Sequence, residues 1–392
     1  METKVKFKFQ NNIFKALVLI SILYLSAGQS QKVKDLLQSG HDILEGFEVE
    51  IPKYLPNHQD LEYISKQTLP GLPEQTLFEI INQACSIYLD SGKIDPRITP
   101  KAENINFQLR APCKNISIPI LEADKIVDLP EFDVNGQVVI YISGWRTTIN
   151  GTTETQDMAN AFNCRGGYNF LYVDPSNYVQ TIYTWSAFNT EAVGAFVAEG
   201  IVKLVKKIPL KNIYLIGHSL GAQMVGKAGR QFTNLTGQYI PRITGLDPAN
   251  PCFNEGEVLS GILRGDADFV DIIHTNPGVL GKKEPRGNVD FYVEGYGPIK
   301  PRCTKFGCSH KRAVKYYTES VYPGHESDFL AKRCNSLISL NTGRCDGPEY
   351  PMGFATPSNL NGKFFLNVNG VPPYGKNATT GIESNACGLC TK

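Results

Sequence analysis

The sequence lacks an excess of charge of either sign, since 39 Lys and Arg residues balance 38 Asp and Glu residues in a chain of 392, for a formal net charge of +1. This balance excludes a protein that binds nucleic acid through its bulk charge, and no lipid surface is expected to be selected by bulk charge alone. The sequence also lacks repeats and low-complexity tracts, which excludes fibrous and disordered classes. With 42% hydrophobic residues, the chain can build one large core or two ordinary ones.

Long hydrophobic runs are scarce, and the one near the start is short. Four lysines between positions 4 and 15 precede an apolar run over 16–25, and Ser26-Ala27-Gly28 follow it with small side chains. This layout predicts a secretory signal peptide over residues 1–28. An uncleaved anchor is the alternative, but a run of about ten residues is short for a membrane span. Because no later run is long enough to span, we expect a secreted, extracellular protein without a transmembrane segment.

Cysteine is not scarce, because the chain has 10. On a secretory route an even number of cysteines favours disulfides, and the partners of most of them stay open, with Cys164 and Cys252 as candidate free thiols. The C-terminal pair Cys387 and Cys390 has the spacing of a redox or metal motif. Without a nearby histidine cluster we expect a plain disulfide there, no metal and no cofactor. Four sequons are glycosylation candidates: Asn115, Asn150, Asn234 and Asn377.

The chain changes texture at about residue 107. Residues 29–106 contain helix-like patches broken by prolines and are predicted to form an N-terminal extension. Beyond them, short apolar runs rich in β-formers alternate with helical or loop segments; the runs cover 137–142, 170–173, 213–216, 243–246 and 269–273, and the longest helical segment covers 189–207. Nearly continuous apolar strands of this kind are typical of a sheet that is buried on both faces. Residues 107–392 are therefore predicted to form an α/β domain with a mainly parallel central sheet.

One motif of this domain carries chemistry. Gly217-His218-Ser219-Leu220-Gly221 lies between the apolar run at 212–216 and a helix-like stretch at 222–228. A G-x-S-x-G sequence between a strand and a helix is typical of the sharp turn that exposes a nucleophilic serine. The motif alone is moderate evidence, since glycine is common, and its strand-to-helix setting strengthens it.

A neutral serine needs a base and an acid that orients the base. Histidine is rare in the chain, and only His274, His310 and His325 follow Ser219, the order that this kind of turn favours. Asp247 is the strongest acid candidate, because it directly follows the next predicted strand, although a turn-forming Asp before proline is the simpler interpretation. Spacing does not choose the histidine: His274 ends a strand, whereas His310 lies on a Cys-rich loop.

Four segments together resemble the animal lipase family, which contains pancreatic lipase, secreted phospholipases A1 and insect yolk proteins. The segments are 217–222, 245–249, His274-Thr275 and 308–313, in the family's order. The resemblance covers residues from about 107 onward and implies an α/β-hydrolase fold. It implies Ser219 as nucleophile, Asp247 as acid and His310 as base, with His274 in a structural role. Yolk proteins of the family have lost the serine, and this chain has not.

The resemblance also implies an oxyanion hole formed by the backbone N–H groups of Leu220 and Trp145. In the loop before Trp145, the family's histidine is replaced by Ser143. By the same resemblance, Cys303 pairs with Cys308 around a very short lid loop.

A second disulfide is implied between Cys334 and Cys345. Within the family a reduced lid accompanies phospholipid hydrolysis, so the resemblance implies a carboxylester hydrolase that prefers phospholipid to triacylglycerol and acts at a membrane, micelle or lipoprotein surface. A triacylglycerol lipase is one alternative. Another is a lipid-binding or storage protein without turnover, and residues 29–105 as a restraining propeptide are a third hypothesis.

Overall fold

The computed structural model of the chain describes residues 99–145, 153–179, 183–254, 259–305, 307–379, 381 and 387–390. The predicted signal peptide, residues 29–98 of the predicted extension and the sequon at Asn150 lie outside the described residues. The boundaries at residues 28 and 106 therefore stay predictions. All described residues lie within one compact unit.

An 11-stranded sheet runs through the described residues in the order β10-β9-β11-β8-β7-β6-β5-β3-β4-β1-β2. The strands are β1 (Asn106–Ala111), β2 (Lys114–Pro119), β3 (Gln137–Ile142), β4 (Tyr168–Val173), β5 (Ile213–His218), β6 (Arg242–Leu246), β7 (Phe269–His274), β8 (Val289–Val293), β9 (Leu330–Cys334), β10 (Glu349–Pro351) and β11 (Gly362–Leu366). Every pairing from β4 through β3 and β5–β8 to β11 is parallel, and the two strands at each edge are antiparallel. Each predicted apolar run lies in a strand, which confirms the α/β fold with a mainly parallel sheet.

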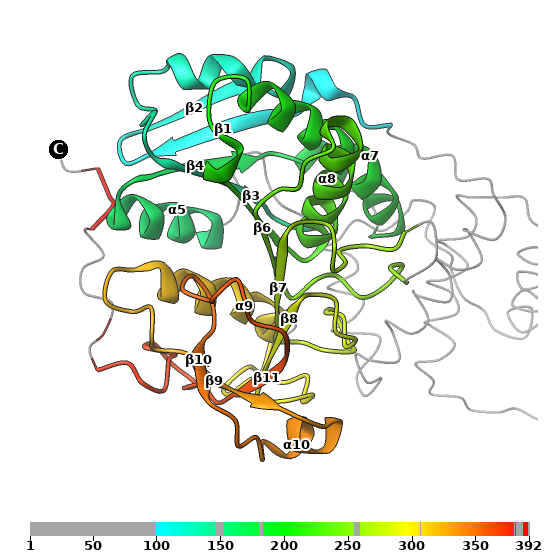
Figure 1. Ribbon diagram of the computed structural model, residues 1–392, viewed down its shortest axis with the longest axis vertical. Coiled ribbons are helices and arrows are strands. Elements are labelled where there is room, and N and C mark those ends of the chain that lie inside the picture. The colour runs from blue at the N-terminus through cyan, green and yellow to red at the C-terminus, as the bar shows by residue number, and fades with distance from the viewer. Residues whose placement is uncertain are drawn as a thin grey trace, which may run out of the picture. The chain divides into compact units, whose positions relative to one another are not determined.

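Helices cover both faces of the sheet. They are α5 (Thr153–Arg165), α6 (Ser176–Val179), α7 (Tyr183–Leu204), α8 (Leu220–Thr236), α9 (Cys308–Val321) and α10 (Leu337–Thr342), with 3-10 turns η1 (Ala102–Asn104), η2 (Ile120–Asp128) and η3 (Leu210–Asn212). Figure 1 shows α7 and α8 against one face and α5 and α9 against the other. Across the described ranges, none of these helices has the length and hydropathy needed to cross a bilayer.

The helix predicted over 189–207 is α7, with shifted ends. It begins at Tyr183, because the apolar positions continue back through Ala187, and both of these side chains are buried. It ends at Leu204, a few residues before Pro209, whose missing N–H and fixed ring oppose further helix. The helix thus starts earlier and stops earlier than its pattern predicts.

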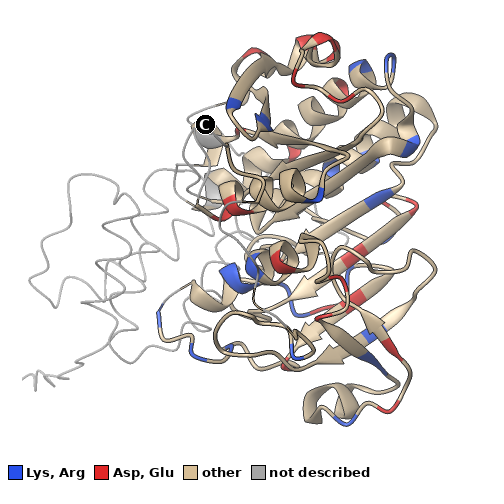
Figure 2. Ribbon diagram, turned by 90° about the vertical axis from the view of Figure 1, so that its left-hand side faces the viewer, with Lys and Arg blue, Asp and Glu red and all other residues tan. Residues whose placement is uncertain are grey.

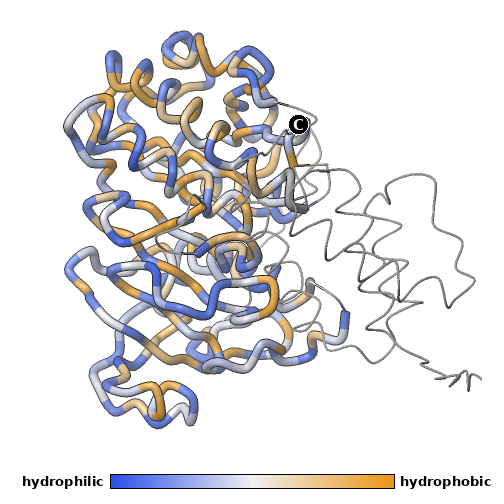
Figure 3. The backbone as a smooth tube through the Cα atoms, turned by 90° about the vertical axis from the view of Figure 1, so that its right-hand side faces the viewer, coloured by the Kyte–Doolittle hydropathy of each residue, from blue (hydrophilic) through white to orange (hydrophobic). Residues whose placement is uncertain are grey.

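The central strands are buried along almost their whole length. In β3 five consecutive residues are buried, and β7 and β8 are buried throughout. Such strands have no solvent-facing side, because helices cover both faces of a parallel sheet. In Figure 3 the strand segments are mostly hydrophobic, and the turns at the outside are mostly hydrophilic.

The disulfides correct one expectation. Cys164 is bonded to Cys387, and Cys252 is also disulfide-bonded, so neither is a free thiol. Cys390 is bonded to Cys113, so the C-terminal cysteines do form disulfides, but with distant partners rather than with each other. The partners lie 223 and 277 positions away, and only the folded chain brings them together. The two pairs implied by the resemblance, Cys303–Cys308 and Cys334–Cys345, are also bonded.

Candidate active site

The serine of the G-x-S-x-G sequence occupies a strained turn between β5 and α8. Ser219 has φ 57° and ψ −123°, a conformation that side-chain-bearing residues rarely adopt, and its side chain is nearly buried. The glycines are needed because the backbone is crowded: a Cβ added at Gly221 would lie 2.1 Å from the carbonyl oxygen of Ile142. The sequence thus folds at this point into the sharp strand-to-helix turn that its motif predicts.

Asp247 follows the neighbouring strand at the same edge of the sheet. His218 is paired with Leu246, so Ser219 and Asp247 directly follow paired residues of β5 and β6. The Ser219 N–H donates to the Leu246 carbonyl (3.1 Å), which joins the two turns. The Asp247 carboxylate is fully buried, and its Oδ1 accepts from the backbone N–H groups of Thr275 (2.7 Å) and Asn276 (2.9 Å) at the end of β7.

His310 lies in the first turn of α9 and meets the same carboxylate. Its Nδ1 donates to Asp247 Oδ2 at 2.6 Å, although 63 residues separate the two in sequence. Burial alone would raise the pKa of Asp247, but the hydrogen bonds from His310, Asn276 and Thr275 hold this pKa below its usual range. Asp247 is therefore a buried carboxylate that fixes the orientation of the imidazole. With Nδ1 as donor, Nε2 is the nitrogen that can accept a proton.

The other two histidines after Ser219 also pair with carboxylates, elsewhere in the fold. His274 is fully buried, with Nε2 2.9 Å from Asp290 Oδ1 and Nδ1 2.8 Å from the Lys282 carbonyl oxygen. Its ring stacks on Tyr292 at a centroid distance of 4.2 Å. His325 donates to Asp328, three residues further along the chain. Of the three histidines, it is His310 that the fold brings to Asp247.

The predicted oxyanion donors lie beside the serine. Leu220 is the first residue of α8, where a backbone N–H has no partner within the helix. On the other side, a Cβ added at Gly144 would lie 2.5 Å from Ser219 Cβ and 3.0 Å from its Oγ, so this loop passes directly against Ser219. Trp145 follows, and its ring meets Tyr183 edge to face.

Ser143, which stands in place of the family's histidine, is buried in this loop. Its hydroxyl lies 3.2 Å from the Tyr172 hydroxyl on β4. Behind the tyrosine, the guanidinium of Arg110 lies 5.3 Å from the centre of the ring. The contact between Ser143 and Tyr172 thus anchors the loop to β4. The sequence did not indicate this arrangement.

Two further residues of the site were missed from sequence. His218 lies against His310, with ring centroids 4.6 Å apart, and its Nε2 lies 3.3 Å from the His310 carbonyl oxygen. Burial and the charge of His310 lower the pKa of His218 to about 3, so its ring is neutral at physiological pH.

Lys300 is also buried, and its ammonium donates to the Gly297 carbonyl. Burial lowers the pKa of Lys300 to about 8, opposed by the charge of Asp247. The position of His218 within the G-x-S-x-G motif could have indicated that it belongs to the site. No feature of the sequence around Lys300 indicated its burial there.

The segment that leads into the Cys303–Cys308 loop is hydrogen-bonded to the first turn of α9. The Lys300 N–H donates to Ser309 Oγ at 2.9 Å, one residue before His310. Thr304 and Lys305 are exposed, and Phe306 lies outside the described residues. The segment after β7 packs against the turn that follows β6, since the Lys282 N–H donates to the Pro248 carbonyl (2.8 Å). Both segments lie close against the rim of the site.

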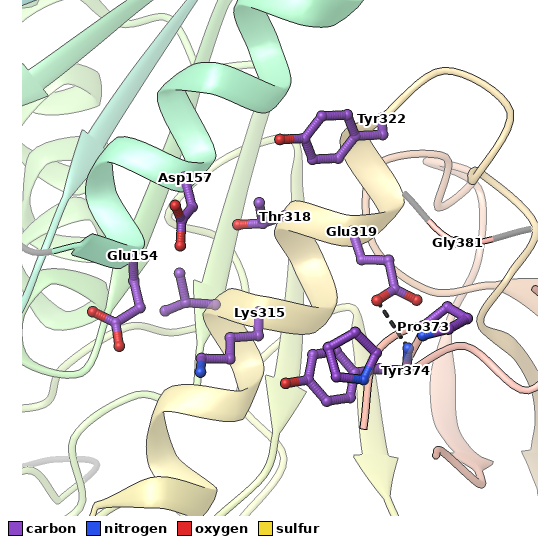
Figure 4. Close-up of a pocket in the computed structure, with 11 residues that line it drawn as sticks. Glu154, Asp157, Lys315, Thr318, Glu319, Tyr322, Pro373, Tyr374 and Gly381 are labelled. Atoms are coloured by element: carbon purple, nitrogen blue, oxygen red, sulfur yellow. Dashed lines mark hydrogen bonds between the residues drawn. The ribbon is translucent and has the colours of Figure 1, made fainter. Parts of the chain in front are cut away.

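A separate hollow of about 500 Å³ lies between α5 and α9, beyond the turn that holds His310. Figure 4 shows Glu154 and Asp157 on α5 across from Lys315 and Thr318 on α9, with Pro373 to the right of Lys315. Charged side chains make this hollow a poor place for an acyl chain, because their desolvation is costly. Among the described residues, no group of three or more His, Cys, Asp or Glu side chains is arranged to hold a metal ion.

The sequons that fall on described residues are accessible. Asn115 on β2, Asn234 near the end of α8 and Asn377 near the C-terminus are all exposed. Exposure permits glycosylation without requiring it, so their use stays a prediction.

Sequence comparisons match most of the chain. A sequence model of the family described as Lipase matches residues 91–374. Vitellogenin-1 of Ceratitis capitata is 34% identical over 223 residues, which cover 56% of this chain and 51% of that protein. Phospholipase A1 2 of Dolichovespula maculata is 43% identical over 144 residues (36% and 47%), and lipoprotein lipase of Neovison vison is 33% identical over 242 residues (55% and 49%). The matches span about half the length of these relatives.

Solved structures are similar at a lower level. MGS-M1, an α/β hydrolase enzyme from a deep-sea metagenome library, is 10% identical, with a TM-score of 0.28 over 46% of this chain and 68% of that one. A predicted CIB-like hydrolase from Thermoplasma acidophilum is 16% identical, with a TM-score of 0.25 over 57% of this chain and 80% of that one.

Proposed function

This chain belongs to the lipase family, and we propose that it is a secreted serine hydrolase that cleaves acyl esters of lipids with Ser219, His310 and Asp247 as its catalytic residues. The observation that carries the proposal is the hydrogen bond of 2.6 Å between His310 Nδ1 and Asp247 Oδ2, beside a serine held in a strained turn. A buried carboxylate, an oriented imidazole and a serine in a strained strand-to-helix turn are the parts that ester hydrolysis needs.

The steps follow from these positions. His310 Nε2 removes the Ser219 proton as the oxygen attacks the ester carbonyl, and the backbone N–H groups of Leu220 and Trp145 stabilise the resulting oxyanion. His310 then gives the proton to the leaving alcohol, and an acyl-serine remains. Water, activated by the same imidazole, releases the fatty acid and restores the serine. Throughout, Asp247 stabilises the imidazolium.

The proposed substrate is phospholipid rather than triacylglycerol. Two observations support this choice: the disulfide loop before α9 is too short to form a flap, and a wasp phospholipase A1 is among the relatives. Lipoprotein lipase is a relative too, so triacylglycerol is the alternative substrate. Insertion of a long lid between Cys303 and Cys308 should change the ratio of the two activities, and an unchanged ratio would contradict the role assigned to the loop.

A second candidate function is lipid storage or binding without turnover. The similarity to Vitellogenin-1 of Ceratitis capitata and Vitellogenin-3 of Drosophila melanogaster favours it. The serine, base and acid of the site are all present in this chain, which favours turnover instead.

The deciding experiment measures fatty acid release by the secreted, purified protein from dispersions of phosphatidylcholine and of triacylglycerol in parallel. Ser219→Ala is the blank, since it removes the nucleophile and leaves the turn. Release that disappears in the blank supports the proposed hydrolase, and the ratio of the rates identifies its substrate class. A folded protein that releases no more than the blank from either dispersion supports the storage function.

A further inference from the structure

Two loops beside the candidate active site contain basic residues and no acidic residue. They cover 298–305, before α9, and 367–376, after β11. Arg302 and Lys305 are exposed in the first loop, together with Ile299, whose exposed fraction is 71%. In the second loop, Val371 is 48% exposed. We call the side chains of Ile299, Arg302, Lys305 and Val371 the rim surface.

The two loops are held together by one buried side chain. The guanidinium of Arg312 on α9 donates to the carbonyl oxygens of Gly370 (2.9 Å) and Pro301 (3.3 Å), one in each loop. Its Nε also donates to Cys303 Sγ at 3.4 Å, so the disulfide is part of the same cluster. Arg302 packs against the second loop, since a Cβ added at Gly370 would lie 2.9 Å from Arg302 Cγ. The two loops that bear the rim surface thus pack against each other.

The carboxylates near the rim surface are engaged elsewhere. Glu294 accepts from the Val368 N–H (2.8 Å), and Glu319 accepts from the N–H groups of Tyr374 (2.9 Å) and Gly375 (2.8 Å). Glu154 is paired with Lys311 at 3.2 Å. In the view of Figure 2, by contrast, acidic and basic positions are interspersed along the described ribbon. The exposed charges of the two loops are therefore those of basic side chains, Arg302 and Lys305 among them, a local feature that the net charge of +1 conceals.

We propose that the rim surface docks onto bilayers that contain anionic phospholipid and so brings the site that holds His310 against such membranes. This inference rests on the proposed function and specifies its substrate surface. Basic side chains next to a bilayer are attracted by anionic headgroups, and exposed aliphatic side chains gain by entering the interface. A soluble polyanion would use the charges but would leave Ile299 and Val371 in water, which is why the membrane is favoured.

The test measures binding of the full-length secreted protein with Ser219→Ala, which leaves the lipid intact. Sedimentation with vesicles of phosphatidylcholine is compared with sedimentation with vesicles that also contain phosphatidylserine. We expect tighter binding to the anionic vesicles, and a loss of about tenfold or more in that affinity after Arg302→Glu with Lys305→Glu, since each basic residue contributes roughly a factor of five at such a surface. Ile299→Ser should weaken binding to both kinds of vesicle.

The matched control is Lys206→Glu with Lys211→Glu, two exposed lysines near the opposite, amino end of β5. This double variant changes net charge equally and should keep the affinity, and thermal melting of all variants checks their folding. Equal binding to both vesicles, or equal losses in the two double variants, overturns the proposal. The proposal is also overturned if Arg302→Glu with Lys305→Glu weakens binding to heparin but leaves binding to the vesicles unchanged. Hydrolysis of a soluble ester by the protein with Ser219 intact is measured separately: without it the proposed function fails, while charge-dependent docking still stands.

Discussion

Two histidine–aspartate pairs of this protein invite comparison: His310–Asp247 at the edge of the sheet and His274–Asp290 between β7 and β8. Their distances are similar, at 2.6 and 2.9 Å, and all four side chains are largely or fully buried. The pairs differ in what meets the second nitrogen of the imidazole. In His274 this nitrogen faces the Lys282 carbonyl, and the ring is stacked on Tyr292.

The second nitrogen of His310, Nε2, does not brace the fold as the Nδ1 of His274 does. The His310 ring lies against His218, the residue before the serine. The same two residue types therefore form a structural brace in one place and a candidate base in the other. Which role a histidine takes depends on its whole set of neighbours, and the carboxylate alone does not decide it.

The largest expected effect comes from removing the candidate base. His310→Gln should lower kcat/KM for fatty acid release by about 10³–10⁴-fold, because the serine loses its proton acceptor. Thermal unfolding should change less than in the His274→Gln variant, because the Asp247 carboxylate keeps the N–H donors of Thr275 and Asn276. Release assays and melting curves on the same preparations check both expectations, and a variant that keeps a tenth of the activity would exclude His310 as base.

The same substitution in the other pair should affect stability instead. His274→Gln removes a fully buried ring whose two nitrogens both face acceptors, which should lower the free energy of unfolding by about 2–4 kcal/mol. Activity per folded molecule should stay within a few-fold of the wild type. Urea unfolding with intact disulfides, together with titration of active sites, separates the two quantities. A large loss of activity in a fully folded variant would show that the comparison is wrong.

A third test concerns the charge near Asp247. In the folded protein burial lowers the pKa of Lys300 to about 8, whereas its ordinary value is 10.5. Below pH 8 the ammonium is charged in both states and its burial destabilises the fold; between about pH 8 and 10.5 the folded state releases its proton first, so stability rises with pH. Lys300→Met should be more stable by about 1–3 kcal/mol at pH 7, with a smaller gain at pH 9.5. Unfolding free energies at the two pH values check this, and a gain that does not depend on pH would contradict the burial of a charge.

The smallest effect is expected at His218. Its pKa of about 3 keeps the ring neutral throughout the range in which lipids are normally assayed. His218→Phe should therefore leave the position of the acid limb of the pH–rate profile unchanged between pH 5 and 9, even if the rate falls a few-fold. An acid limb that moves by a full pH unit would show that His218 titrates in the site, contrary to its low pKa.

Much of the site could be predicted because its parts are local or lie at neighbouring strand ends. Ser219 was indicated by the flanking glycines, since the turn leaves no room for side chains at their positions. Asp247 was indicated by its position directly after the next strand. The choice of histidine was different. Spacing left His274, His310 and His325 open, and the resemblance to the lipases chose His310. In the structure His310 is hydrogen-bonded to Asp247. The backbone N–H groups of Thr275 and Asn276 also donate to this carboxylate, which the sequence did not predict.

The sequence by itself determined the features that depend on neighbours in the chain: the apolar strands, the parallel α/β order and the nucleophile turn. Their causes are periodicity and local sterics, which a short segment contains in full. Only the tertiary structure decided the partners of Cys113, Cys164, Cys387 and Cys390 and the burial of Lys300. Cys113 and Cys390, for example, are 277 positions apart, and their pairing depends on packing of the whole chain rather than on any property of either segment.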